Sequence, residues 1–185
     1  AIVIDTGPLQ ATISRTQPTL LDTVSVDGEA IVTPEAAAAN LPAVVAGEGN
    51  EYPASADGLQ VSFIRQGPNE TVIRREGWYT GADGTRFCQF ITYTWFFAGS
   101  TSVRHDHTLV VGFDTTQHTI RDIRLAVPGQ NASAVLAAGG GEAVEATALP
   151  ARVVQTAVDE CAVTDAAGKI ATGERCEGYA GGGNV

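Results

Sequence analysis

Hydrophobic and polar residues alternate along most of this 185-residue chain, and stretches rich in Gly, Pro, Asn and Asp separate the alternating segments. Side chains on a β-strand point alternately to its two faces, so a period of two residues is typical of strands that bury one face. The clearest turn is Asp27-Gly28, because a two-residue hairpin needs the positive φ angles that Asp and Gly tolerate. The pattern predicts strands over residues 1–5, 9–14, 20–26, 29–33, 58–65, 70–78, 85–97, 101–113 and 118–128.

One short helix and a weaker C-terminal region complete the pattern. PEAAAAN, residues 34–40, has Pro in its first turn, which favours a helix, although one too short to be stable alone. After Pro128 we expect two or three short edge strands with a flexible tip at glycines 139–141, and then a Gly-rich tail over 178–185. No domain boundary is visible. The sequence therefore predicts one all-β domain over residues 1–185, a single distorted antiparallel β-barrel or sandwich-like domain.

Charge and composition narrow the class of protein. The chain has 11 basic and 21 acidic residues, a net charge of -10, whereas a nucleic-acid binder needs a basic surface. No apolar run approaches the roughly 20 residues that span a bilayer. The chain contains no Met, so we interpret Ala1 as a processed N-terminus or as a boundary inside a longer precursor. A removed signal peptide explains this, and we expect a secreted protein, extracellular or on the cell surface.

Two of the three cysteines are predicted to pair. Cys161 and Cys176 flank AVTDAAGKIATGER, whose centre AAGK predicts a turn between two short strands. This arrangement places the two cysteines opposite each other across a hairpin, within reach of a disulfide. The alternative is two unpaired small residues. Cys88 lies in the most aromatic segment and is expected to be a buried free thiol.

All three histidines, His105, His107 and His118, lie within fourteen residues. His105 and His107 share a face with the apolar residues of their strand, because both occupy odd-numbered positions. Two histidines at i and i+2 can bind a metal together, but no third ligand is evident nearby. We therefore interpret the pair as core or barrel-lining residues, with Thr92 and Thr94 supplying hydroxyls. The sequence assigns no catalytic residue, no metal and no cofactor.

The segment RREGWYTGADGTRF combines arginine with aromatic residues, as surfaces that stack on sugars do. The alternative is a hairpin whose aromatic side chains pack on a neighbouring strand. The candidate sugar-contacting residues are Arg75, Trp78, Tyr79 and Arg86.

Two tripeptides match the N-glycosylation pattern: NET at Asn69 and NAS at Asn131. Such tripeptides also arise by chance. Both fall in predicted loops, so the chain is a candidate glycoprotein if its host modifies exported chains.

Three segments, taken together, resemble a known domain. They are VIDTGPLQATIS with LLDTVSVDGEAIV, RREGWYTGADGTRFCQFITYTWFFAGSTSVRHDHTLVV with TIRDIRLAVP, and VVQTAVDECAVTDAAGKIATGERCEGYA. In this pattern of strands and turns the chain is similar to the PcRGLX/YetA-like N-terminal RIFT barrel domain, which implies a β-barrel fold. The resemblance covers most of the chain and contains no catalytic signature.

The resemblance also implies an extracellular, carbohydrate-related lineage. The family includes exo-acting rhamnogalacturonan lyases, large secreted enzymes whose chemistry resides in a helical toroid domain downstream of the barrel. The chain stops at Val185, where that domain is expected to begin. The resemblance therefore transfers no catalytic residue and does not imply lyase activity.

Three functions from different classes are compatible with the sequence. The first is an exported, non-catalytic structural subunit that self-assembles into a homopolymer or filament. The second is a carbohydrate-binding or accessory module related to a polysaccharide lyase, and the third is a small enzyme that uses the histidine strand. Assembly is predicted to occur by terminal strand addition, because an exposed edge strand is a template for a neighbouring sheet. The predicted assembly contacts are Ala1, Ile2, Val3, Ile4 and Tyr179; the expected partners are other copies of the chain and, in the second function, a polysaccharide.

Overall fold

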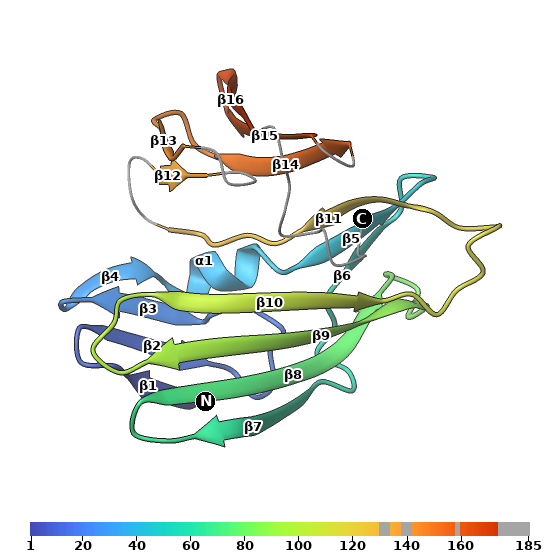
Figure 1. The fold of residues 1–185 in the computed structure, drawn as a ribbon. Coiled ribbons are helices and arrows are strands. Elements are labelled where there is room, and N and C mark those ends of the chain that lie inside the picture. Colours follow the sequence, from blue (N-terminus) through green and yellow to red (C-terminus); the bar gives the residue numbers. More distant parts are fainter. Residues whose placement is uncertain (130–133, 138–141, 158–159, 174–185) are drawn as a thin grey trace. The chain divides into compact units, whose positions relative to one another are not determined.

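A computed structural model of the chain describes residues 1–129, 134–137, 142–157 and 160–173. The chain divides into two compact units, Ala1–Gln130 and Asn131–Val185, each with its own sheets. Strands make up nearly all the regular structure of both units (Figure 1). The all-β prediction is thus confirmed, whereas the prediction of one domain over residues 1–185 stays a prediction.

The first sheet of the N-terminal unit is an antiparallel meander in the order β1-β2-β3-β4. Its tightest turn contains Asp27 with φ 50° and Gly28 with φ 85°, so the predicted two-residue hairpin is confirmed. The strands are β1 (Ile2–Asp5), β2 (Leu9–Ile13), β3 (Thr23–Val26) and β4 (Glu29–Val32).

A longer sheet in the order β10-β9-β8-β7 lies against the first one (Figure 1). Burial alternates residue by residue from Ile73 to Thr80 of β8 and from Cys88 to Phe97 of β9, because one face of this sheet is more deeply covered than the other. We call these the inner face and the outer face. The strands are β7 (Gln60–Gln66), β8 (Glu70–Thr80), β9 (Arg86–Phe97) and β10 (Val103–Val110).

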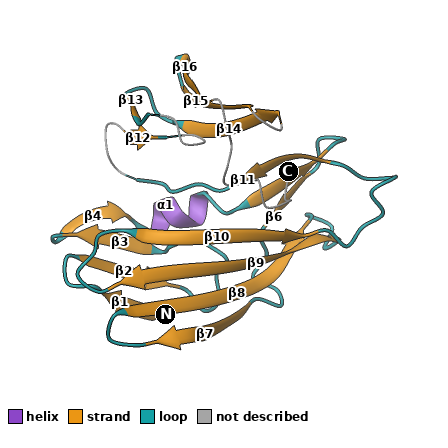
Figure 2. Cartoon of the chain, viewed as in Figure 1, coloured by secondary structure: helices purple, strands orange, loops and turns teal. Residues whose placement is uncertain are grey.

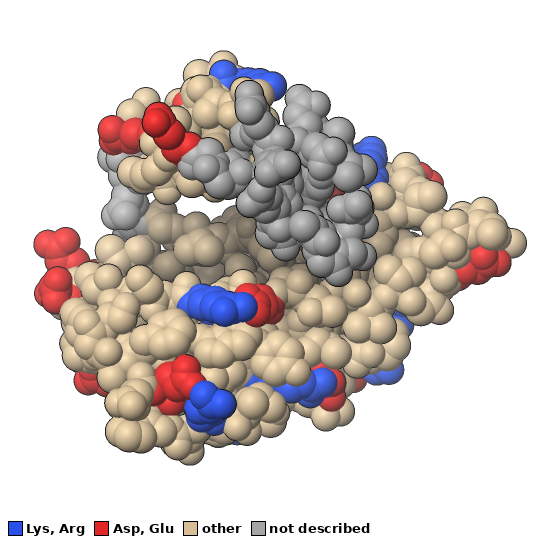
Figure 3. All heavy atoms as spheres, viewed as in Figure 1, with Lys and Arg blue, Asp and Glu red and all other residues tan. Residues whose placement is uncertain are grey.

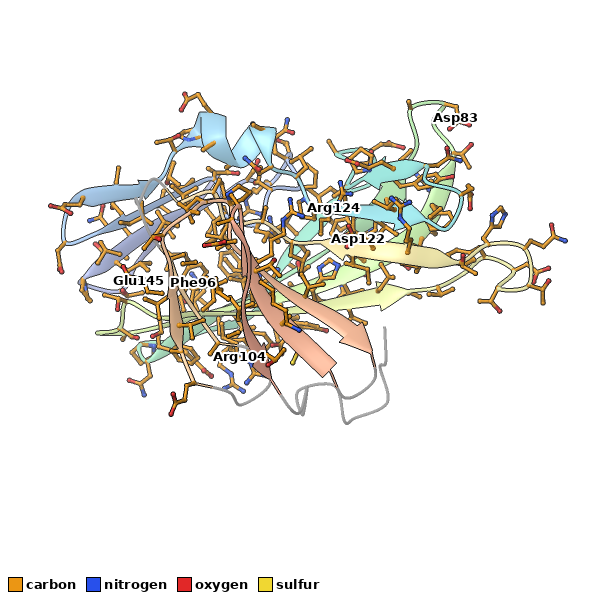
Figure 4. The ribbon with its side chains drawn as sticks, turned by 90° about the horizontal axis from the view of Figure 1, so that it is seen from above. Asp83, Phe96, Arg104, Asp122, Arg124 and Glu145 are labelled. Carbon is orange, nitrogen blue, oxygen red and sulfur yellow. The ribbon has the colours of Figure 1, made fainter. Side chains whose placement is uncertain are left out.

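The third sheet, β11-β5-β6, contains two strands that the sequence analysis missed. Strand β5 (Ala43–Ala46) is buried at all four positions, so its sequence AVVA shows no alternation. Strands β6 (Glu51–Pro53) and β11 (Ile120–Arg124) flank it. Arg124 binds Asp122 at 2.7 Å and Glu51 of β6 at 2.9 Å, which joins the two edges of this sheet; Figure 4 shows Asp122 and Arg124 together on β11.

The predicted helix is present as α1 (Pro34–Ala39), drawn in purple in Figure 2. Thr33 has extended backbone angles and its hydroxyl accepts a hydrogen bond from the Ala36 amide, while Pro34 occupies the first turn. No helix in the described part of the chain is long and apolar enough to cross a membrane.

The inner face of the long sheet carries two separate apolar cores. At one end, Ile73 and Phe96 of the long sheet pack in the same core as Leu9 and Ile13 of the first sheet. At the other end, the aromatic side chains of β8 and β9 pack against β5 and β11. Between the two cores lie the polar inner-face residues, which are Arg75, Thr92, Thr94, His105 and His107.

The described residues of the C-terminal unit form two small sheets. One pairs β12 (Ala134–Leu136) with β13 (Val144–Ala146), and the other has the order β14-β15-β16. Strands β15 (Glu160–Asp165) and β16 (Gly168–Gly173) form the hairpin predicted around AAGK, and β14 (Arg152–Ala157) pairs with β15. Buried Cys161 and Val163 form the centre of its core.

These sheets do not form the expected barrel. Among the described residues, each sheet has two free edges in its strand order, and the long sheet is covered on one face by two others. The architecture of the N-terminal unit is therefore a sandwich. A barrel requires one sheet whose first and last strands pair, and alternation along a strand does not distinguish a sheet that closes from two sheets that face each other.

Candidate functional site

Three of the four candidate sugar-contacting residues, Arg75, Trp78 and Tyr79, lie on β8 and are divided between its two faces, and Arg86 is the first residue of β9. Arg75 and Tyr79 point to the inner face, where their relative exposures are 2% and 0%. They therefore cannot belong to an exposed sugar-binding surface, which corrects the sequence-based interpretation. Trp78 points outward and is half-buried, and the guanidinium carbon of exposed Arg86 lies 5.2 Å from the centre of its ring. Trp78 and Arg86 remain candidates.

Arg75 is a buried cation held by main-chain oxygens. Its two terminal nitrogens donate to the carbonyl oxygen of Thr19 and, at 2.8 Å, to that of Leu20. Burial lowers the pKa of Arg75 to about 10, an effect partly opposed by the charge of Asp22. The side chain is still charged at neutral pH. No carboxylate of the described residues is bonded to it, so carbonyl dipoles provide most of its solvation.

Two neutral histidines lie beside this cation on the inner face. The Nδ1 atom of His105 is 2.9 Å from the Thr94 hydroxyl, and Nε2 of His107 is 3.0 Å from the Tyr79 hydroxyl. Burial first, and then the charge of Arg75, lowers the pKa of each histidine to about 4. The expected core position of the pair is confirmed. Thr94 bonds a histidine as expected, whereas Tyr79 takes the place predicted for Thr92.

His118 lies apart from this pair. It packs edge-on against Phe87 and Phe113, and its Nδ1 atom is 3.8 Å from a carboxylate oxygen of Glu48. No group of three or more His, Cys, Asp or Glu side chains suited to a metal occurs within residues 1–129 or in the other described ranges.

The outer face of the long sheet presents aromatic rings among charged side chains. Tyr93 and Trp95 of β9 lie with ring centroids 5.7 Å apart, and both are half-buried. The guanidinium carbon of Arg104 lies 4.8 Å from the centre of the Trp95 ring. Ion pairs flank the rings, formed by Arg74 with Glu76, Arg104 with Asp106, and Arg86 with Asp57. Figure 3 shows basic and acidic side chains in adjacent pairs over this sheet.

Tyr93, Trp95 and Arg104 were not among the candidate residues predicted from the sequence. A signal was available, because from Cys88 to Phe96 the buried residues of β9 have even numbers whereas Tyr93 and Trp95 have odd numbers. Alternation applied to this segment, as it was to the histidine strand, separates the two sets.

The remaining predicted sites have mixed outcomes. Cys88 is a buried free thiol, as predicted, and burial raises its pKa to about 12. The strand register places Gly173 opposite Cys161, and Cys176 lies outside the described residues, so the disulfide stays a prediction. Asn69 is exposed in the turn between β7 and β8, and Asn131 lies outside the described residues. Glycosylation of either is untested.

The predicted assembly contacts at the N-terminus lie on an edge strand. Among the strands that the structure describes, β1 pairs only with β2. Ile2 is buried, and Ile4 packs against the core that contains Ile73 and Phe96. Ala1 is exposed, and Val3 is 73% exposed. Tyr179 lies outside the described residues.

Comparison with known proteins gives one match. A family model, that of the PcRGLX-like protein central beta sandwich domain, matches residues 1–133 and so covers the whole N-terminal unit. No curated protein and no solved structure matches the chain. The predicted resemblance to PcRGLX-like proteins is confirmed, and the matched domain is their central sandwich, not their N-terminal RIFT barrel.

The low histidine pKa values predict a loss of stability in mild acid. In the unfolded chain each imidazole has a pKa near 6.5, against about 4 in the folded protein, so only the unfolded state binds protons between these values. The free energy of unfolding should therefore fall as pH drops from about 6.5 toward 4, by about 2 kcal/mol for each histidine. Urea unfolding across this range measures the slope.

The variants His105→Gln and His107→Gln should each remove about half of the histidine-dependent part of that slope. His118→Gln is the matched control, because this side chain is about half exposed, and it should keep the wild-type slope. An equal slope in all four proteins would contradict the assignment of the pH dependence to the buried pair.

Proposed function

This chain belongs to the family of PcRGLX-like central beta sandwich domains, and on that premise we propose that it is a non-catalytic, extracellular module that binds an extended polysaccharide. The binding surface is the outer face of the long sheet. The observation that carries the proposal is the row of half-buried rings on that face, Tyr93 and Trp95 on β9 with Trp78 on β8, bordered by ion pairs.

The chemistry of the outer face suits sugars. The apolar faces of sugar rings stack on aromatic side chains, and their hydroxyls exchange hydrogen bonds with arginine and carboxylate groups. The strand register places Trp78 opposite Gln89, six residues along β9 from Trp95. At about 3.3 Å per residue the aromatic side chains extend over roughly 20 Å, so an extended chain suits the surface better than a single sugar.

The buried polar cluster supports a non-catalytic role. Arg75, His107 and Tyr79 are residue types that stabilise charge and transfer protons. The cavity that borders Arg75 and His107, however, has a volume of about 10 Å³, and a sugar ring is many times larger. The cluster therefore offers no room for a polysaccharide substrate, and we assign these residues to the interior of the sandwich.

We predict that the intact chain binds soluble rhamnogalacturonan, the substrate class of the resembling enzymes, and that Trp95→Ala and Tyr93→Ala each weaken binding at least about tenfold. Loss of one stacking surface corresponds to about 1.4 kcal/mol. Titration calorimetry measures the affinity. Ultraviolet absorbance of the same mixtures should show no formation of double bonds.

Thr108→Ala is the matched control, because Thr108 is an exposed residue on the outer face of β10 and carries no ring. It should bind as the wild type does. The proposal fails if the wild type does not bind, if the two ring variants bind as well as Thr108→Ala, or if purified chain turns over the polysaccharide.

A second candidate function is self-assembly into a homopolymer by strand addition. Strand β1 supports it, because one side of this strand has no neighbour among the described strands and Val3 is exposed to solvent. Edge strands that are neither charged nor covered are templates for pairing with another chain. Asp5 is the acidic residue on this strand, at its end, and leaves residues 2–4 uncharged.

We predict that wild-type chain sediments as an oligomer and that Val3→Lys shifts it to monomer, because lysine on an edge strand opposes pairing. Val127→Lys is the control, since Val127 is 68% exposed and lies outside every strand. Sedimentation velocity at high protein concentration measures the mass. Monomeric wild type, or a Val3→Lys protein that assembles normally, would exclude assembly through β1.

A further inference from the structure

Three polar side chains form one row across the middle of the long sheet. In the strand register Arg75 of β8 lies opposite Thr92 of β9, and Thr92 lies opposite His107 of β10. Neighbours in such a row have their Cβ atoms about 5 Å apart on the same face. Arg75 and Thr92 are each 2% exposed, so this row lies in the interior between the two apolar cores.

Each member of this row has a buried polar atom that lacks a hydrogen-bond partner among the described residues. The atoms are Nε of Arg75, Oγ1 of Thr92 and Nδ1 of His107. An unpaired buried donor or acceptor costs about 1–3 kcal/mol. Three such atoms on adjacent strands of one sheet therefore point to a common partner.

A cavity of about 10 Å³ adjoins all three side chains. Its other lining residues are Pro18, Leu20, Pro42 and Phe90, which have no side-chain hydrogen-bonding groups. One water molecule needs roughly this volume and two to four polar partners. Chloride is larger than water, and the cavity has no space for it without movement of its walls.

The hydrogen bonds around His107 define what the cavity must hold. Burial raises the pKa of Tyr79, so its hydroxyl stays protonated and is able to donate a hydrogen bond to Nε2 of His107, 3.0 Å away. With Tyr79 as the donor in this bond, the neutral imidazole carries its own hydrogen on Nδ1. Nε of Arg75 is also a donor, whereas the Thr92 hydroxyl both donates and accepts. The common partner must accept one hydrogen bond from Arg75 and one from His107, and it must either donate to the Thr92 hydroxyl or accept from it.

We propose that this cavity binds one ordered water molecule, which accepts hydrogen bonds from Nε of Arg75 and Nδ1 of His107 and donates one to Oγ1 of Thr92. The water is bonded to one residue each of β8, β9 and β10, among the polar residues that lie between the two cores. It links the cation to the histidine without bringing a counter-charge into the interior.

A high-resolution crystal structure of the intact chain, grown with bromide in place of chloride, tests the site. We expect one spherical density peak about 2.7–3.2 Å from each of the three atoms, with no anomalous bromide signal. A bromide signal in the cavity would show an anion site and overturn the proposal. Absence of density, or direct bonding of the three atoms to protein groups, would also overturn it.

Nuclear magnetic resonance adds a test with matched variants. Magnetisation from a long-lived water should reach the Nδ1 hydrogen of His107 in the wild type, and Thr92→Val should lose this transfer because the water loses its acceptor. Thr94→Val is the control: Thr94 lies on the same face of β9 but bonds His105. The transfer should persist in that variant. No transfer in the wild type, or equal transfer in both variants, would contradict a bound water.

Discussion

The interior of the N-terminal unit depends on the hydrogen bonds between the buried Arg75 guanidinium and two main-chain carbonyls. Burying a cation is unfavourable by several kcal/mol unless it is paired or hydrogen-bonded, and here the carbonyls of Thr19 and Leu20 supply the bonds. These carbonyls belong to the segment between β2 and β3, so the contact ties the first sheet to the middle of the long one. The same charge and the same burial keep His105 and His107 neutral.

The long sheet separates two kinds of chemistry because its side chains alternate. On β8 the neighbours Arg74 and Arg75 have opposite environments, one paired with Glu76 at the surface and the other enclosed by main-chain oxygens. From Cys88 to Phe96 on β9, the even-numbered residues supply the two cores and the polar residues between them, and the odd-numbered Tyr93 and Trp95 supply the outer rings. In this sheet the type of a residue therefore indicates its role only when the face to which its side chain points is also known.

Much of the local structure follows from the sequence, and most of the tertiary arrangement does not. The Asp27-Gly28 turn, the helix that begins at Pro34 and the inward direction of His105 and His107 were predicted from backbone preferences and period-two alternation. Strand β5 was missed because burial on both faces removes the alternation. Arg75 and Tyr79 were named as candidate sugar contacts from their residue types alone, and their burial fits the alternative of side chains packed inside the fold.

Two features required the structure itself. The row of Arg75, Thr92 and His107 depends on the register between three strands, which alternation within each strand leaves undetermined. The carbonyl partners of Arg75 lie 55 and 56 residues away in the chain, in a segment without a recognisable motif. The same lack of inter-strand information explains why a barrel was expected where two sheets cover a third.

The most direct test of this account is the same substitution at two adjacent arginines, followed by urea unfolding. Lysine keeps the charge but lacks the planar fork that reaches two carbonyls, and its ammonium is more strongly hydrated. Arg75→Lys should therefore lower the free energy of unfolding by about 2–4 kcal/mol. Arg74→Lys, on the outer face, should change it by no more than about 0.5 kcal/mol. Equal, small losses in the two variants would show that the sandwich does not depend on the buried guanidinium.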